Sequence, residues 1–193
     1  MPMDRHTLQT RLCQYRSHYI EEQAYARRGC RLLQDDPDCF FREGTGLHVT
    51  ASTWILNPTR SATLLMLHRK LEQWFQPGGH ADGNENVVAV ALKECSEETG
   101  ITEADIHLLD PAIFDIDIHR TPQRGREPAH QHLDIRFLVE IDDRLPLAGN
   151  SESHALRWIP LHEVHAYNKG LSIHRMLIKS QEWLRQQRIQ GLT

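Results

Sequence analysis

A helix-forming segment that carries three closely spaced glutamates constrains this chain most. Residues 87–99 begin with the apolar run VVAVAL and continue into KECSEET before Gly100. At about 100° per residue, Glu94, Glu97 and Glu98 share an arc of about 100° at the border of the apolar stripe. Like charges at this spacing repel one another unless a partner compensates them. The segment therefore predicts a helix, ended by its glycine, whose edge against the protein core is rich in carboxylates.

Apolar segments with strand character precede and follow this helix. Turn residues separate them, and a second amphipathic helix is expected near the C-terminus. Strands interleaved with two sizeable helices predict an α/β fold, in which a mixed sheet is covered on both faces as an α/β/α sandwich. The segments expected to form strands are 47–56, 61–69, 106–119, 130–141 and 154–161.

The N-terminal part of the chain has a different pattern. Residues 4–34 show a helical spacing of apolar side chains, and Asp4 is placed to cap the start of a helix. The polar sequence QDDPDC then interrupts this pattern. We expect an N-terminal helical extension over residues 1–44 and one domain over residues 45–193. The extension is either a cover over one sheet edge or an arm that forms a homodimer.

Charge and apolar content narrow the classes of partner. The net charge is -4 and no basic face dominates, which argues against binding to a nucleic-acid polymer. The N-terminal sequence has no apolar signal core, and no apolar run approaches ~18 residues, so a membrane partner is not expected. The 4 cysteines contain no Cys-x-x-Cys pair. These features predict reduced cysteines and a cytoplasmic location.

Carboxylates held together at a partly desolvated border either raise their pKa values or bind a cation. Carboxylate oxygens suit a hard ion such as Mg²⁺, with Mn²⁺ as the alternative, and Mg²⁺ commonly completes its shell with water and substrate phosphates. Upstream, Gly78 and Gly79 permit a close backbone approach, so that a glycine carbonyl could join the metal ligands. The alternative is a solvated acidic face in which Lys93 and Glu97 form an i,i+4 pair.

Residues 79–101 as a whole resemble the Nudix box, G-x5-E-x7-R-E-U-x-E-E-x-G-U, where U is aliphatic. The pattern has two departures, because Lys93 stands in the arginine position and Cys95 in an aliphatic one. A buried thiol behaves as a small hydrophobic group, whereas an ammonium lacks the planar fork that braces a carboxylate bidentately. The matching residues are Gly79, Glu85, Glu94, Glu97, Glu98, Gly100 and Ile101.

The resemblance implies a Nudix-type sandwich over roughly residues 45–190 and a set of roles for the box. Glu94, Glu97 and Glu98 are implied as metal ligands, with the carbonyl of Gly78 or Gly79 assisting. Glu85 is implied to orient Lys93 or a water in the outer shell. In this family a general base often comes from another loop, and Glu152 in GNSESHALRWIP is the candidate, although a solvated loop glutamate fits that position equally well.

Substrate contacts are expected from an alternating segment at 130–140. His132, Asp134 and Arg136 share one face of the expected strand, and a sheet covered on both sides carries such residues where a face borders a cleft. We therefore predict these three at the substrate pocket, with Arg136 contacting a phosphate or ribose, and His80 beside the glycines. The alternatives are a transition-metal pair formed by His130 and His132, or a hydrogen-bonded structural network.

Trp74 and the loop at 120–130 each have two alternative roles. Trp74 is either a core residue or a platform for base stacking. The loop at 120–130 carries Arg120, Arg124 and Arg126, and it is either a lid over the substrate phosphates or a solvated crossover.

The resemblance implies hydrolysis of a diphosphate linkage in a nucleoside diphosphate joined to another group, such as a sugar or ribose phosphate. The partner is then a nucleotide-type small molecule, and the cofactor is a divalent ion. One alternative is a nucleoside triphosphate pyrophosphohydrolase that cleans the nucleotide pool. The other is a sensing module that binds a nucleotide without turning it over; such modules commonly lack box glutamates that this chain retains.

Overall fold

The computed structural model describes residues 3–42, 46–123, 128–189 and 191. Contacts divide the chain into two compact units. The first unit comprises Met1–Ser52, Gly78–Glu94 and Ala112–Phe137, and the second comprises Thr53–Pro77, Cys95–Pro111 and Leu138–Thr193. The sequence-predicted boundary between residues 44 and 45 lies outside the described residues, so the division into an extension and one domain stays a prediction.

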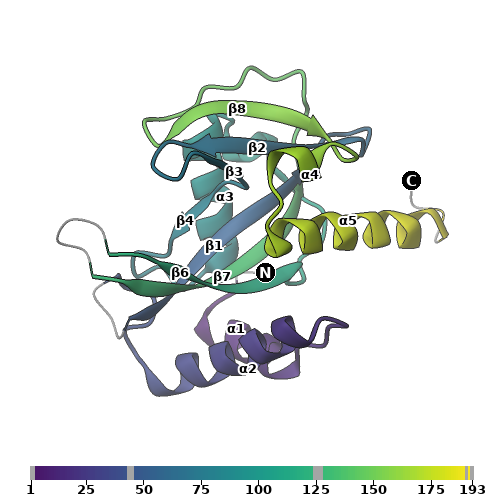
Figure 1. Cartoon of the computed structure of the whole chain (residues 1–193). Helices are drawn as coiled ribbons and strands as arrows, with labels where there is room; N and C mark the ends of the chain where they lie inside the picture. The colour runs from purple at the N-terminus through teal and green to yellow at the C-terminus, as the bar shows by residue number, and fades with distance from the viewer. Residues whose placement is uncertain (1–2, 43–45, 124–127, 190, 192–193) are drawn as a thin grey trace. The chain divides into compact units, whose positions relative to one another are not determined.

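Groups of strands lie between helices along the chain, as the sequence predicts (Figure 1). Strands β1 and β7 and helix α3 contribute residues to both units. The elements are α1 (Arg5–Gln14), α2 (Ile20–Asp35), β1 (Leu47–Leu56), β2 (Ala62–His68), β3 (Gln73–Phe75), β4 (Gly78–His80), α3 (Val87–Thr99), a 3-10 turn (Glu103–Asp105), β5 (His107–Leu108), β6 (Asp115–Thr121), β7 (His130–Glu140), β8 (Ser153–Pro160), α4 (Val164–Tyr167) and α5 (Leu171–Ile189).

In the first unit, β4 pairs with β1 and β6 pairs with β7, both antiparallel. Strand β1 also neighbours β7. The Gln131 N–H donates to the Gly46 carbonyl at one end of this pair, and the Ile141 N–H donates to the Leu56 carbonyl at the other. Both bonds join residues at the same sequence separation, so β1 and β7 run parallel. The sheet is therefore mixed, as predicted.

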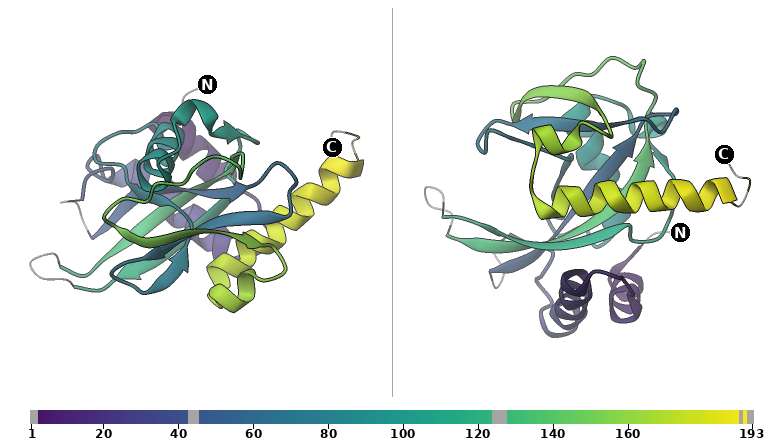
Figure 2. Two further views of the ribbon diagram at one scale, coloured as in Figure 1. Left: turned by 90° about the horizontal axis from the view of Figure 1, so that it is seen from above. Right: turned by 45° about the vertical axis from the view of Figure 1, so that its right-hand side comes forward.

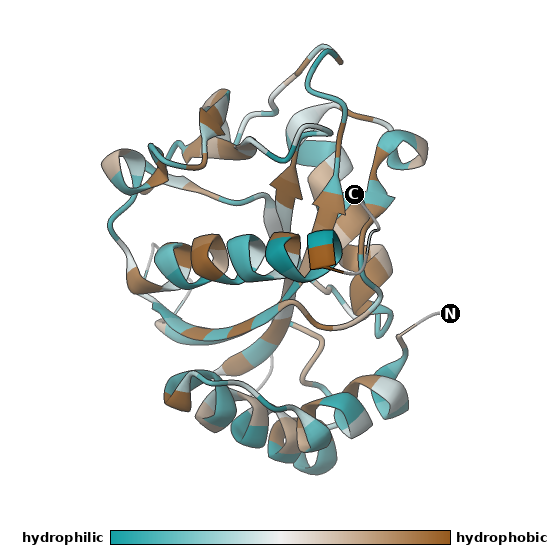
Figure 3. Ribbon diagram, turned by 90° about the vertical axis from the view of Figure 1, so that its right-hand side faces the viewer, coloured by the Kyte–Doolittle hydropathy of each residue, from teal (hydrophilic) through white to brown (hydrophobic). Residues whose placement is uncertain are grey.

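Helices α1 and α2 form a hairpin in the first unit, and they lie side by side in Figures 1 and 2. Asp4 caps α1, because its carboxylate accepts a hydrogen bond from the Thr7 N–H at 2.9 Å. Each helix alternates hydrophilic and hydrophobic residues along its length (Figure 3). The buried apolar side chains of the hairpin are Leu8, Leu12, Ala26 and Leu33.

The helical character that the sequence predicts over residues 4–34 is confirmed, and the segment forms two helices with a break between α1 and α2. The buried Glu22 accounts for the break, because its carboxylate accepts hydrogen bonds from the Ser17 hydroxyl and, at 2.7 Å, from the Tyr15 hydroxyl. The prediction that the cysteines are reduced is wrong for one pair, because Cys13 and Cys30 form a disulfide between the two helices.

In the second unit, β2 pairs antiparallel with β8 along its length and with β3 at one end. The end of β1 forms a hairpin with β2, where Leu56 lies opposite Thr63. Asn57 holds the turn, because its side-chain oxygen accepts from the Ser61 and Ala62 N–H groups at 2.9 and 3.0 Å. The inward face of α5 buries Ile173, Met176 and Leu177, as its spacing predicts. Among the described residues, every helix is too short or too polar to cross a lipid bilayer.

Candidate active site

Helix α3 has defined start and stop signals. At its start, the Asn86 side-chain oxygen accepts from the Ala89 N–H at 3.4 Å, which is the geometry of an N-cap. At its end, Gly100 has φ +74, and its N–H donates to the Ser96 carbonyl at 2.8 Å. A Cβ at Gly100 would lie 2.7 Å from the Cβ of Ala148. The predicted helix and its glycine stop are therefore confirmed.

The two glycines of β4 meet different neighbours. A Cβ added to Gly79 would lie 2.1 Å from Oε2 of Glu94, so the β4 backbone lies directly against that carboxylate. A Cβ added to Gly78 would instead lie 2.2 Å from the Cβ of Ser52 and 2.7 Å from the Ala51 carbonyl oxygen. Gly79 therefore permits the approach of a box glutamate, whereas Gly78 permits the pairing of β4 with β1.

The three box glutamates differ in exposure along α3. Glu94 is half-buried, Glu97 is exposed and Glu98 is buried. The ammonium of Lys93 lies 3.2 Å from Oε1 of Glu94. This contact places the unusual lysine against a predicted metal ligand, and the Lys93–Glu97 pair considered from the sequence stays a prediction.

Glu85 lies in the loop before α3, and its side chain is 48% exposed. Its ion-pair partner is Arg5 of α1, at 3.6 Å from the Glu85 Oε1. The guanidinium of Arg5 also donates to the carbonyls of Leu33 and Pro37 at the end of α2, at 2.9 and 3.0 Å. Sequence reasoning missed Arg5, because only the folded hairpin brings it near the box.

The loop between β4 and α3 is held by residues that follow α2. Gly83 has φ +85, and its N–H donates to the Phe40 carbonyl at 2.9 Å. Arg42 donates to both carboxylate oxygens of Asp82, at 2.8 and 3.2 Å. These hydrogen bonds lower the pKa of Asp82 below its ordinary value. The loop residues of the box are therefore fixed partly by the N-terminal segment.

The guanidinium of Arg136 is surrounded by carboxylates. It donates to Asp134 at 2.7 Å, to Asp115 at 3.0 Å and to Asp117 at 3.3 Å, and it is only 3% exposed. Burial alone would lower the pKa of Arg136, but the attraction of the three carboxylates outweighs burial and raises it. Asp134 also accepts from the Ser52 hydroxyl at 2.8 Å. This is the geometry of the structural network that the sequence left as the alternative, and a substrate role for Asp134 or Arg136 stays a prediction.

His80 and His132 come together with two other histidines in the first unit. The ligand atoms of His48, His80, His130 and His132 lie within 4.8 Å of one another. Burial is the main cause and the positive charge of Arg42 the second cause that lower the pKa of His80 to about 4. Burial and the neighbouring histidines lower the pKa of His132 to about 2. Sequence reasoning paired His130 with His132 but missed His48, which lies 82 positions before His130 and offers no local signal.

The remaining candidates have contacts of their own. Glu152 is exposed in the turn before β8, and its carbonyl accepts from the Arg69 N–H at 2.8 Å. The Trp74 indole packs edge-on against Tyr167, with ring centroids 5.6 Å apart. Arg120 lies exposed near the end of β6, whereas Arg124 and Arg126 lie outside the described residues. The roles of these residues stay predictions.

Comparison with known families identifies the class of protein. Residues 46–180 match the family model described as the NUDIX domain. The chain belongs to the Nudix family.

Two curated relatives share part of the sequence. The uncharacterized Nudix hydrolase NudL of Yersinia pestis is 33% identical over 127 residues, which cover 61% of this chain and 57% of that protein. A probable DHNTP pyrophosphohydrolase of Lactococcus lactis is 31% identical over 78 residues, covering 40% of this chain and 45% of that protein. The chain thus spans about half the length of the curated relatives it matches.

Solved structures share the fold. The Ap4A hydrolase of C. elegans matches with a TM-score of 0.59 at 17% identity, over 71% of this chain and 97% of that one. The dihydroneopterin triphosphate pyrophosphohydrolase of E. coli matches with a TM-score of 0.55 at 14% identity, over 67% and 91%. The NUDIX domain of Shewanella oneidensis NrtR, solved with ADP ribose, matches with a TM-score of 0.52 at 16% identity, over 80% and 97%. At these identities the likeness establishes the Nudix fold alone.

Proposed function

We propose that this chain is a divalent-metal-dependent pyrophosphohydrolase that acts on a nucleoside diphosphate joined to another group, of the nucleotide-sugar or ADP-ribose type. The observation that carries the proposal is the contact between the β4 backbone and a box carboxylate. The Gly79 backbone lies so close to Glu94 that a Cβ at this position would overlap the carboxylate. The glycine strand and the helix of the box therefore meet at this carboxylate.

The donor set of α3 fits Mg²⁺, and it fits Mn²⁺ as well. Glu94, Glu97 and Glu98 belong to one continuous helix at spacings of three and four residues, which places their carboxylates on one face. Hard cations of this kind take carboxylate oxygens and keep open positions for water and phosphate oxygens. The Gly79 carbonyl is the backbone candidate for the same shell. The spacing of the three glutamates in the box supports the proposal that these residues bind a metal ion.

When bound, such an ion supplies positive charge against the diphosphate oxygens and makes water a better nucleophile. The residues of the chain perform the positioning. Lys93 holds one oxygen of Glu94 and turns the other toward the Gly79 backbone, where its Oε2 is found. Glu97 presents its carboxylate on the exposed side of the helix. Glu152 is our candidate for the group that accepts the proton of the attacking water.

A second candidate function is hydrolysis of a nucleoside triphosphate to a monophosphate and pyrophosphate. One comparison favours it, because the Lactococcus relative is named as a probable DHNTP pyrophosphohydrolase. The box chemistry is the same for both candidates, since each reaction breaks a phosphoric anhydride. Recognition of the base and of the leaving group decides between them.

A substrate panel tests the proposal. The purified chain is incubated with ADP-ribose, nucleotide sugars, dinucleoside polyphosphates and nucleoside triphosphates, with Mg²⁺, with Mn²⁺ or with EDTA, and nucleoside monophosphate is measured. We expect metal-dependent release of monophosphate from a diphosphate-linked substrate. Turnover of triphosphates alone would select the second candidate. Tight nucleotide binding with no turnover in any arm would overturn both, and would identify a sensing module.

A further inference from the structure

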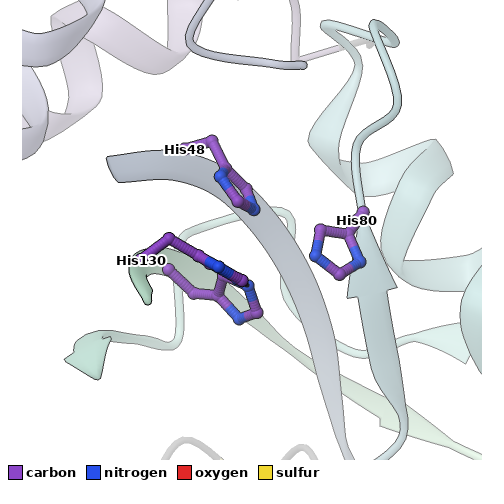
Figure 4. Close-up of side chains that lie close together, drawn as sticks. His48, His80 and His130 are labelled. Carbon is purple, nitrogen blue, oxygen red and sulfur yellow. Dashed lines mark hydrogen bonds between the residues drawn. The ribbon is translucent and has the colours of Figure 1, made fainter. Parts of the chain in front are cut away.

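The four clustered histidines come from three strands of the first unit. His48 lies on β1, His80 lies on β4, and His130 and His132 lie on β7. Figure 4 shows the rings of His48, His80 and His130 turned toward a common space. The ring of His48 has its centroid 5.2, 5.0 and 4.8 Å from those of His80, His130 and His132.

The strand registers explain why these rings converge. His80 lies opposite Thr50 in the β1–β4 pair, and His48 is two positions before Thr50, so all three side chains share one face. His130 and His132 are likewise two positions apart on β7, the strand beside β1. The sheet therefore brings four imidazoles to one face.

Ring nitrogens of the cluster have lone pairs that can bind a cation. The Nδ1–H of His130 can donate to the Pro128 carbonyl at 2.9 Å, which leaves its Nε2 as the lone-pair nitrogen. That Nε2 lies 2.9 Å from Nε2 of His132. Within the part of the chain that the structure describes, Nε2 of His80 is buried without a hydrogen-bond partner. His48 is 1% exposed and His130 is 7% exposed, so water reaches them little.

A purely structural network explains this arrangement less well. Each neutral imidazole has one N–H group and one lone pair, and when the His130 N–H is directed at the Pro128 carbonyl, three N–H groups remain for four lone pairs. The carboxylate nearest in sequence on β7, Asp134, accepts from Arg136, Ser52 and Thr50. A cation that accepts nitrogen lone pairs would satisfy the cluster without protonating it.

We propose that His48, His80, His130 and His132 bind one divalent transition-metal ion, for which Zn²⁺ is the best fit. Imidazole nitrogen suits zinc, whereas Mg²⁺ prefers oxygen. Tetrahedral zinc at about 2.0–2.1 Å from each nitrogen needs nitrogens roughly 3.3 Å apart. The ligand atoms already lie within 4.8 Å, and small side-chain rotations close the difference. The site is separate from the Mg²⁺ proposal and does not depend on the proposed function.

Metal binding to the tag-free chain tests the proposal directly. The protein is stripped with a chelator, dialysed and titrated with Co²⁺, and visible absorption is recorded, followed by displacement with Zn²⁺. We expect the intense bands of tetrahedral cobalt, one equivalent of Zn²⁺ per chain by elemental analysis, and no displacement by millimolar Mg²⁺. No uptake of either ion, or only the weak spectrum of six-coordinate cobalt, would overturn the proposal.

Variants locate the site. His132→Gln and His80→Gln are expected to weaken Zn²⁺ binding at least about tenfold, because each removes one of four ligands. His174→Gln is the matched control, since His165 and His174 form an exposed pair with ring centroids 5.9 Å apart. Glu97→Gln should retain the cobalt spectrum, which separates this site from the box.

The folding of each variant is checked by circular dichroism. If a histidine variant does not fold, the spectrum and stoichiometry of the unsubstituted chain decide the question. Loss of binding in His174→Gln, or unchanged binding in folded His132→Gln and His80→Gln, would place the metal elsewhere and contradict the proposal.

Discussion

At the scale of single residues, neighbouring positions of the box have different physical roles. Gly78 and Gly79 are adjacent, yet the first lies against the backbone of β1 and the second against the carboxylate of Glu94. Lys93 stands where the box has arginine. Its ammonium contacts Oε1, the other oxygen of the Glu94 carboxylate. The position of Glu94 is therefore determined by both sides, by the strand and by its own helix.

Substitution of the two glycines should separate stability from activity. Gly79→Ala is expected to reduce metal-dependent turnover at least about 100-fold, because the methyl group displaces the Glu94 carboxylate, while the melting temperature changes by only a few degrees. Gly78→Ala is expected to destabilise the fold by more than about 2 kcal/mol, because it overlaps backbone atoms of β1. Kinetics and thermal melts measure both. Equal effects of the two variants on both readouts would contradict these roles.

Lys93 should contribute modestly, because its ammonium is half-exposed and solvent screens the pair. Lys93→Ala is expected to lower kcat/KM about 3- to 10-fold. Lys93→Arg is expected to match or exceed the unsubstituted enzyme, since a guanidinium can hold the carboxylate bidentately. Lys169→Ala, an exposed lysine outside the box, is the control. Inactive Lys93→Arg would show that the lysine acts by some means other than holding Glu94.

The site could be predicted from the sequence where its residues follow one another closely. Glu94, Glu97 and Glu98 are one helical turn apart, so their spacing alone places them on one face. Arg5 and His48 could not be found in this way, because helix packing and strand pairing bring them to Glu85 and to His130. Arg136 shows a further reason: alternation gives its face of the strand, but not the three carboxylates that surround it.

At the scale of elements, the α1–α2 hairpin differs most from its sequence pattern. Tyr15 and Tyr19 continue the apolar spacing of α1, yet the helix ends at Gln14. The polar anchor at Glu22 outweighs this local preference, since a buried carboxylate needs donors, and it also accepts from the Ile116 N–H at 3.1 Å. The spacing of the cysteines carried no signal either, because Cys13 and Cys30 meet only once the hairpin closes.

A thiol count tests the disulfide and the burial of the other cysteines. Cys39 and Cys95 are buried, and burial raises their pKa values to about 11 and about 12. The native chain should therefore react negligibly with a thiol reagent at pH 8. We expect two reactive thiols per chain in urea and four after reduction.

Reduction should also destabilise the hairpin. A loop closed over a sequence separation of 17 is expected to contribute about 3 kcal/mol. A clear fall in the urea midpoint on adding a reductant would confirm this. Four reactive thiols in urea without reductant would show that the disulfide does not form.

At the scale of the whole molecule, the N-terminal residues belong to the structure of the first unit. Gly29 of α2 packs so closely that a Cβ would lie 2.9 Å from Leu133 of β7. Arg5 pairs with the box residue Glu85, and Phe40 receives the N–H of Gly83. These contacts favour a cover over the sheet, although formation of a homodimer stays a prediction.

Deletion of residues 1–44 should therefore cost the chain its stability. Seven apolar side chains in the described part of this segment are buried, namely Met3, Leu8, Leu12, Ala26, Leu33, Cys39 and Phe40. Large apolar side chains contribute about 1.5–3 kcal/mol each when buried, so their loss is comparable with the whole stability of a typical domain. We expect the truncated chain to be aggregated or unfolded by circular dichroism and light scattering.

Ile20→Ser is the matched control for this deletion, since Ile20 is 79% exposed. It should leave both the fold and the molecular mass in solution unchanged. A folded and monomeric truncated chain would instead show an independent domain. A change from dimer to monomer in Ile20→Ser would identify the segment as a dimerisation arm.

The most direct test of the proposed catalytic metal site compares two glutamate-to-glutamine substitutions at exposed helical positions. Glu97→Gln removes a proposed metal ligand, and Glu182→Gln removes another exposed glutamate, from α5. With the best substrate of the panel and saturating Mg²⁺, we expect Glu97→Gln to lose at least about 100-fold in kcat with an unchanged melting temperature. Glu182→Gln should retain full activity. Full activity of folded Glu97→Gln would contradict the assignment of the box as the catalytic metal site.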